Sequence, residues 1–130
     1  MTETEVDGSR LLIVDDDALM RSMACRTLSH AGFSVSEADG GAQALALFDL
    51  TRFDLVLLDV MMPKKTGFEV CQEVRANEAL HGIKILMLTA KGRDTDVAKG
   101  TALGADAYMT KPFATRDLVQ KVAQMLGGAA

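Results

Sequence analysis

The sequence predicts an α/β fold, a doubly wound sheet of five parallel strands with helices on both faces. Five short apolar runs of strand length alternate with five segments of helical periodicity. This alternation favours a parallel sheet with right-handed crossovers and three layers. Several runs are apolar throughout, which is typical of strands buried on both faces. One of them, 55–59, ends in Asp59, at the edge where such sheets build their sites.

The first half of the chain contains three strands and two helices. A short apolar run at 10–14 predicts a buried strand. Apolar and small residues then recur every three or four positions over 17–31, with Arg21 off that stripe. We expect Asp17 to be the N-cap of this helix and Gly32 to end it. The remaining elements are an alternating strand near a sheet edge at 33–38, a helix at roughly 41–50 and the buried strand at 55–59.

The second half of the chain continues the alternation of strands and helices. It predicts a helix near 67–77, a strand at 83–89, a helix at 94–103, a strand at 105–110 and a helix at 114–126. The helix at 94–103 is polar and contains Gly100, so we expect it to be the least stable. Neither a linker composition nor an internal repeat interrupts the pattern. One domain is therefore predicted at 10–126, between flexible ends at 1–9 and 127–130.

Composition limits the classes of function. At 130 residues the chain has room for one core and no second catalytic domain. Its net charge of −4 argues against direct binding of nucleic acid, and no segment is apolar and long enough for a membrane. The acidic start is unlike a signal peptide, and Cys25 and Cys71 lack metal or redox spacing. We therefore expect a cytoplasmic protein with free thiols and a protein partner.

Polar residues suited to phosphate chemistry follow four of the predicted strands. They are Asp15 and Asp16, Asp59, Thr89 and Lys111. All should meet at one edge of the sheet, where crowded carboxylates repel one another and have raised pKa values unless a cation neutralises them. Mg²⁺ prefers such oxygen ligands, while a lysine and a hydroxyl suit the remaining oxygens of a phosphoryl group. The pattern predicts a phosphoryl site with Asp59 as the nucleophile.

The motifs that carry these residues occur in the order and at the spacing of a known family. They are Leu12-Ile13-Val14-Asp15-Asp16, Leu57-Leu58-Asp59-Val60-Met61-Met62-Pro63 with Gly67, Leu88-Thr89-Ala90-Lys91, Gly104-Ala105-Asp106-Ala107-Tyr108 and Lys111-Pro112-Phe113. From about Arg10 to Leu126 the chain resembles the receiver domain of two-component response regulators. The resemblance implies a flavodoxin-like fold with strand order 2-1-3-4-5.

The resemblance also implies how the site works. Asp59 would accept a phosphoryl group from a histidine kinase or a histidine phosphotransfer protein, with Lys111 and Thr89 assisting. Asp16 and Asp59 would bind Mg²⁺ directly, and Mn²⁺ can replace it. Asp15 would act mainly through water, and the main-chain carbonyl of Met61 would complete the ligand set. Such a domain is not a conventional enzyme, but it catalyses its own phosphorylation and dephosphorylation.

The output implied by the resemblance is conformational. Phosphate would draw the Thr89 hydroxyl inward and leave space for the ring of Tyr108. The face formed by the helix at 94–103, the strand at 105–110 and the helix at 114–126 would then change and bind a downstream protein. Few charged pairs lie on that face, so we expect a monomer or a weak dimer.

Two residues should influence the lifetime of the phosphorylated state. They are Met61 and Lys91, two positions beyond the acceptor and the threonine. Neither is an acid or amide that orients an attacking water, so we expect a state that is not especially short-lived. As side chains, Met61 and Met62 are expected to fill the core.

Rival interpretations stay open. A receiver that no longer takes phosphate would be a docking module, although all five site residues are present. An aspartyl-phosphate phosphatase shares the nucleophile and Mg²⁺ but needs an acid where this chain has Met61. A flavin-binding carrier would need a glycine- and hydroxyl-rich loop where the first acids stand. The chain is either a stand-alone receiver, which we favour, or the N-terminal piece of a longer regulator.

Overall fold

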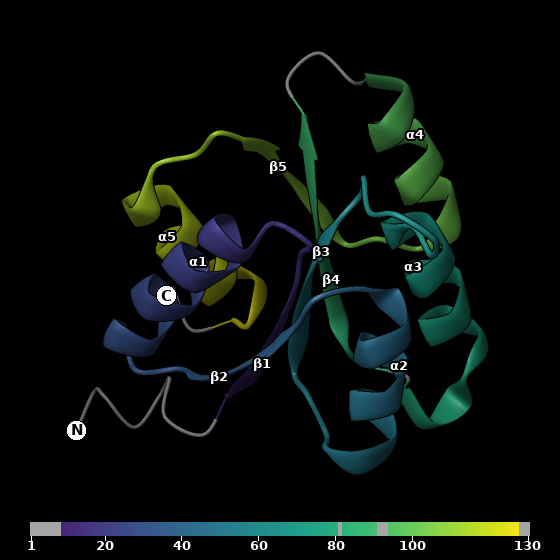
Figure 1. The fold of residues 1–130 in the computed structure, drawn as a ribbon, viewed down its shortest axis with the longest axis horizontal. Helices are drawn as coiled ribbons and strands as arrows, with labels where there is room; N and C mark the ends of the chain where they lie inside the picture. The colour runs from purple at the N-terminus through teal and green to yellow at the C-terminus, as the bar shows by residue number, and fades with distance from the viewer. Residues whose placement is uncertain (1–8, 81, 91–93, 128–130) are drawn as a thin grey trace.

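The three middle strands of the sheet are apolar along almost their whole length. They are β1 (Arg10–Val14), β3 (Leu55–Asp59) and β4 (Lys84–Ala90), and the less buried β2 (Ser34–Ala38) and β5 (Ala107–Lys111) form the edges. All neighbours pair in parallel, in the order β2-β1-β3-β4-β5, which confirms the predicted fold. Figure 1 shows this computed structural model, which describes residues 9–80, 82–90 and 94–127.

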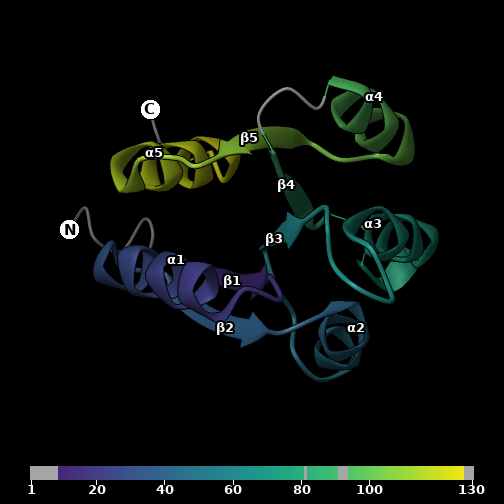
Figure 2. The same cartoon turned by 45° about the horizontal axis from the view of Figure 1, so that its top comes forward.

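The helices cover the sheet in two layers. Figure 2 places α1 (Ala18–His30) and α5 (Thr115–Met125) on one face, opposite α2 (Gly41–Leu50), α3 (Gly67–Ala76) and α4 (Asp94–Leu103). A short 3-10 turn, η2 (Glu78–Leu80), precedes β4 and has no counterpart in the sequence prediction. Within the described part of the chain, no helix is long and apolar enough to cross a membrane.

Side chains of the middle strands alternate between two apolar cores. On the side of α1 and α5, the core holds the odd-numbered residues of β1 and β3 and the even-numbered residues of β4, together with Leu28 and Leu118. On the other side, strand residues of the opposite parity pack with Phe48 and Val70. Because successive strand residues point to opposite faces, this alternation also determines the face on which each strand-end residue lies.

Element boundaries agree with the sequence prediction within two residues. Asp17 caps α1, because its Oδ1 accepts hydrogen bonds of 3.0 and 3.2 Å from two main-chain N–H groups of the first turn. β5 begins at Ala107, two residues later than predicted. The reason is that Asp106 turns its carboxylate back to the N–H of Ile85, at 2.8 Å, and to Arg75. Most of the predicted flexible ends lie outside the described residues.

Candidate metal and phosphoryl site

Strand parity brings three of the predicted site residues to one face of the sheet. Asp15, Asp59 and Lys111 continue the alternation of their strands on the side of α1 and α5. Thr89 continues β4 on the opposite side, where Tyr108 packs. The carboxyl edge of the sheet therefore has the acids and the lysine on one side and the predicted switch residues on the other.

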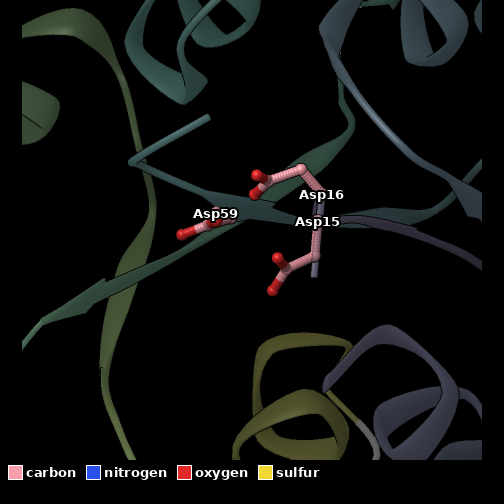
Figure 3. A group of neighbouring side chains, drawn as sticks. All are labelled: Asp15, Asp16 and Asp59. Atoms are coloured by element: carbon pink, nitrogen blue, oxygen red, sulfur yellow. The ribbon is translucent and has the colours of Figure 1, made fainter. Parts of the chain in front are cut away.

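Asp15, Asp16 and Asp59 form the acidic cluster of this edge. One carboxylate oxygen from each residue lies within 4.8 Å of the other two. Figure 3 shows Asp15 and Asp16 leaving the end of β1 in opposite directions, with Asp59 beside them. Asp15 is 0% exposed and Asp59 is 6% exposed, whereas Asp16 is open to solvent. Two of the three aspartates are thus buried, and solvent reaches the cluster at Asp16.

Lys111 links the two buried carboxylates. Its Nζ lies 3.0 Å from Oδ2 of Asp15 and 3.1 Å from Oδ1 of Asp59. Burial by itself would lower the pKa of Lys111, but hydrogen bonds and attraction from the two aspartates outweigh it and raise the pKa above its usual value. The ammonium therefore remains charged at neutral pH and supplies a fixed positive charge beside the acidic cluster.

Burial and crowding strongly perturb the pKa of Asp59. Its pKa is raised from 3.8 to about 6. Burial of the carboxylate is the largest cause, repulsion from Asp15 is the second, and Lys111 acts in the opposite direction. The sequence predicts a raised pKa from crowding of carboxylates, and in the structure burial contributes more than crowding. An ionised Asp59 is a poorly solvated anion, which favours an arriving cation.

The donor set fits a hard divalent cation. The cluster offers three carboxylates, the oxygen donors that Mg²⁺ prefers, and a single ammonium leaves their negative charge incompletely balanced. One oxygen of each carboxylate lies within 4.8 Å of the other two, near enough for one ion to contact more than one of them. The residues present therefore suit the ion that the sequence predicts.

Asp15 has a contact on each of its polar atoms. Its N–H donates to the carbonyl of Ala38 at 3.2 Å, and its Oδ1 accepts from the N–H of Asp17 at 2.9 Å. Its Oδ2 meets Lys111, and its carbonyl oxygen accepts from Nη1 of Arg21 at 2.7 Å. Periodicity alone assigns Arg21 to solvent, so the sequence prediction missed this contact. A cation in the helix that follows an acidic loop is the pattern that could have found it.

The loop after β3 packs directly on the end of that strand. The N–H of Gly67 donates to the carbonyl of Val60 at 3.1 Å, and a Cβ on Gly67 would clash with the carbonyl oxygen of Asp59. Met61 in this loop is 58% exposed, so the expectation that it fills the core is wrong. The strand alternation has ended there, and the next residue, Met62, is buried instead. The N–H of Met61 lies 3.4 Å from Oδ1 of Asp59.

Thr89 and Tyr108, the predicted switch pair, lie on neighbouring strands. Thr89 is buried, and its hydroxyl lies 3.5 Å from the next main-chain carbonyl. The hydroxyl of Tyr108 accepts a hydrogen bond of 3.2 Å from Thr101, and its ring packs over Gly100, where a Cβ would clash. Lys91, which the sequence associates with the lifetime of the phosphorylated state, lies outside the described residues.

Comparison with known proteins defines the class. Residues 11–123 match the family model of the response regulator receiver domain. Among solved structures, the chemotaxis protein CheY4 of Vibrio cholerae is similar, with a TM-score of 0.86 and 36% sequence identity, covering 90% of this chain and 98% of that one. The chain therefore belongs to the receiver-domain family of two-component response regulators.

Curated relatives in this family are longer than the chain. The transcriptional regulatory protein CpxR of Klebsiella pneumoniae is 44% identical over 118 residues, which cover 91% of this chain and 49% of that protein. The phosphate regulon transcriptional regulatory protein PhoB of Pseudomonas aeruginosa is 40% identical over 119 residues, covering 92% and 52%. The chain thus spans about half the length of these relatives.

Proposed function

We propose that this domain is a phosphorylation-dependent signalling switch in which Asp59 accepts a phosphoryl group from a histidine kinase or a histidine phosphotransfer protein. The observation that carries the proposal is the position of Asp59. Its carboxylate ends a buried central strand and lies among two further aspartates and the ammonium of Lys111. Membership of the receiver family supports the same assignment.

Phosphoryl transfer requires a nucleophile and nearby positive charge. A carboxylate oxygen of Asp59 attacks the phosphorus of a phosphohistidine in line, the P–N bond breaks, and its electron pair leaves with the imidazole. Lys111 holds its charge beside the acceptor, and the Thr89 hydroxyl donates to a phosphoryl oxygen. Bound Mg²⁺, or Mn²⁺ in its place, supplies further charge neutralisation. The product is an acyl phosphate, which water hydrolyses at the same site to reset the switch.

For the ion, we assign direct ligation to the carboxylates of Asp16 and Asp59 and to the main-chain carbonyl of Met61. Asp15 acts mainly through water. Its carboxylate is already bonded to Lys111 and to the N–H of Asp17, which supports an indirect role. Asp16 is exposed and faces the solvent from which a hydrated ion arrives.

The output that we propose is a change in the face formed by α4, β5 and α5. Thr89 and Tyr108 connect this face to the site, because both continue the same side of neighbouring strands. A phosphoryl group that recruits the Thr89 hydroxyl favours the conformation in which the Tyr108 ring moves towards it. A downstream protein that binds this face then distinguishes the phosphorylated from the unphosphorylated state. We propose that the domain itself is a monomer or a weak dimer.

The partner is proposed to be a protein in the cytoplasm. In the relatives named as transcriptional regulators, the matched segment is about half of the protein. We therefore propose a link to transcription for this chain only through additional sequence or a DNA-binding partner. The net charge of −4 does not favour direct DNA binding by these 130 residues.

The proposal is tested by phosphoryl uptake from acetyl phosphate, followed by intact mass, with Mg²⁺ or with a chelator. We expect the wild type to gain one phosphoryl group in a Mg²⁺-dependent reaction and Asp59→Asn to gain none. Asp49→Asn, an exposed aspartate on α2, is the matched control and should behave like the wild type. Equal uptake by Asp59→Asn, or no uptake from either acetyl phosphate or a phosphohistidine donor, would contradict the proposal.

A further inference from the structure

Arg21 connects the acidic cluster to the edge of the sheet. It lies in α1, and its side chain is 19% exposed. Nη1 donates to the carbonyl oxygen of Asp15 at 2.7 Å, and Nε pairs with Oε1 of Glu37 in β2 at 3.1 Å. One guanidinium therefore fixes the loop between β1 and α1 relative to a neighbouring strand.

The position of that hydrogen bond matters for Asp16. The carbonyl of Asp15 belongs to the peptide unit that joins Asp15 to Asp16, so Arg21 fixes the plane of this peptide. Asp16 is exposed, and surrounding side chains constrain it less than they constrain buried Asp15. The orientation of the preceding peptide consequently determines the direction in which the Asp16 side chain leaves the main chain.

We propose that Arg21 is a positioning residue of the cation site, which holds the Asp15–Asp16 peptide so that both carboxylates face Asp59. This inference rests on the proposed function, because it requires that the acidic cluster binds Mg²⁺. Outer partners that orient metal ligands typically change metal affinity by about 10- to 100-fold when removed. We place Arg21 in that class, since it contacts the main-chain carbonyl that joins Asp15, which acts mainly through water, to Asp16, a proposed direct ligand.

The sign of the effect separates positioning from simple electrostatics. A guanidinium near a cation site repels the incoming ion. If Arg21 acted only as a charge, its removal would strengthen Mg²⁺ binding. If it positions the ligands, its removal weakens Mg²⁺ binding in spite of the lost repulsion. A purely structural role would lower the stability of the protein and leave the affinity of the folded state unchanged.

The experiment is a Mg²⁺ titration of the unphosphorylated protein, followed by amide chemical shifts, in the wild type and Arg21→Met. We expect the Kd of Arg21→Met to rise about tenfold. Arg26→Met removes the same charge from an exposed position of the same helix and should leave the Kd equal or slightly lower. Should Arg21→Met fail to fold, Arg21→Gln replaces it with the same expectation.

A second readout uses the phosphorylation rate with acetyl phosphate as a function of Mg²⁺. Arg21→Met should need more Mg²⁺ for half its maximal rate and approach the wild-type rate at saturation. A Kd in Arg21→Met that equals or falls below that of the wild type would overturn the role of Arg21 and leave the proposed function standing. A wild type that shows no Mg²⁺ titration would overturn the proposed metal site and this inference together.

Discussion

Asp59 is buried and lies close to another carboxylate, so its charge destabilises the folded protein when no cation is bound. The pKa of about 6 in the folded state exceeds the ordinary value of 3.8, which means that folding favours the neutral form. The folded protein is therefore most stable, as far as Asp59 is concerned, below the pKa of the unfolded state, and this stability is lost as pH rises through the pKa of the folded state. Above pH 6, ionised Asp59 therefore costs at most about 3 kcal/mol of stability.

Replacing Asp59 with the neutral Asn should remove that cost. In chelator, we expect Asp59→Asn to raise the free energy of unfolding by about 2–3 kcal/mol near pH 8. As the pH falls from about 6 to about 4, the difference between the variant and the wild type should shrink. Below about pH 4 it should vanish, because Asp59 of the wild type is then neutral in both the folded and the unfolded state. Urea unfolding across this range measures it. A difference that does not depend on pH would contradict the assigned titration.

Met61 stands beside Asp59, the proposed phosphoryl acceptor, and is 58% exposed, with its N–H 3.4 Å from Oδ1 of Asp59. A thioether does not orient water, so the acyl phosphate should persist. We expect Met61→Asn to shorten the half-life of the phosphorylated protein about tenfold, equivalent to ~1.4 kcal/mol in the barrier. Loss of the phosphoryl mass with time measures this, and Met61→Leu is the control. Equal half-lives for Asn and Leu would show that this position does not influence hydrolysis.

At the scale of elements, the loop between β3 and α3 depends on one glycine. A Cβ at Gly67 would clash with the Asp59 carbonyl oxygen, and its nearest neighbours are all backbone atoms of Asp59 and Val60, which cannot move aside as a flexible side chain can. We expect Gly67→Ala to lower the free energy of unfolding by about 1–3 kcal/mol and to weaken phosphorylation, because the displaced loop carries Met61. Chemical denaturation and phosphoryl uptake are the measurements.

Gly40 provides the matched control for this prediction. It precedes α2 in an extended conformation, and a Cβ there would have nothing within 4 Å. Gly40→Ala should therefore change the free energy of unfolding by less than about 1 kcal/mol and leave phosphoryl uptake unchanged. If Gly67→Ala were as harmless as Gly40→Ala, the close contact between Gly67 and the end of β3 would be wrong.

For the whole molecule, we expect the proposed ion binding to be linked to folding, because the cluster is assembled from the ends of β1 and β3 in the folded chain alone. At Mg²⁺ tenfold above its Kd, the free energy of unfolding should increase by about 1.4 kcal/mol. Asp16→Asn should lose most of this gain. Asp17→Asn keeps a side chain able to cap α1 and should retain it. Equal Mg²⁺ stabilisation in both variants would argue against the assigned ligands.

Much of this architecture could be predicted from the sequence because periodicity and strand ends carry it. Buried runs ending in Asp59 and in Asp15 determine where the acids meet, and parity also places Lys111 with them. What could not be predicted depends on contacts between distant elements. Arg21 looks like a surface residue on its own helix, and the steric role of Gly67 exists only once the loop folds back on its strand.

The most direct test of the central claim is to locate the phosphoryl group on the chain. Borohydride reduces an aspartyl phosphate to homoserine, and tandem mass spectrometry then identifies the position. After phosphorylation with acetyl phosphate and Mg²⁺, we expect homoserine at position 59. Homoserine at another aspartate, or a gain in phosphoryl mass with Asp59 unchanged after reduction, would contradict it.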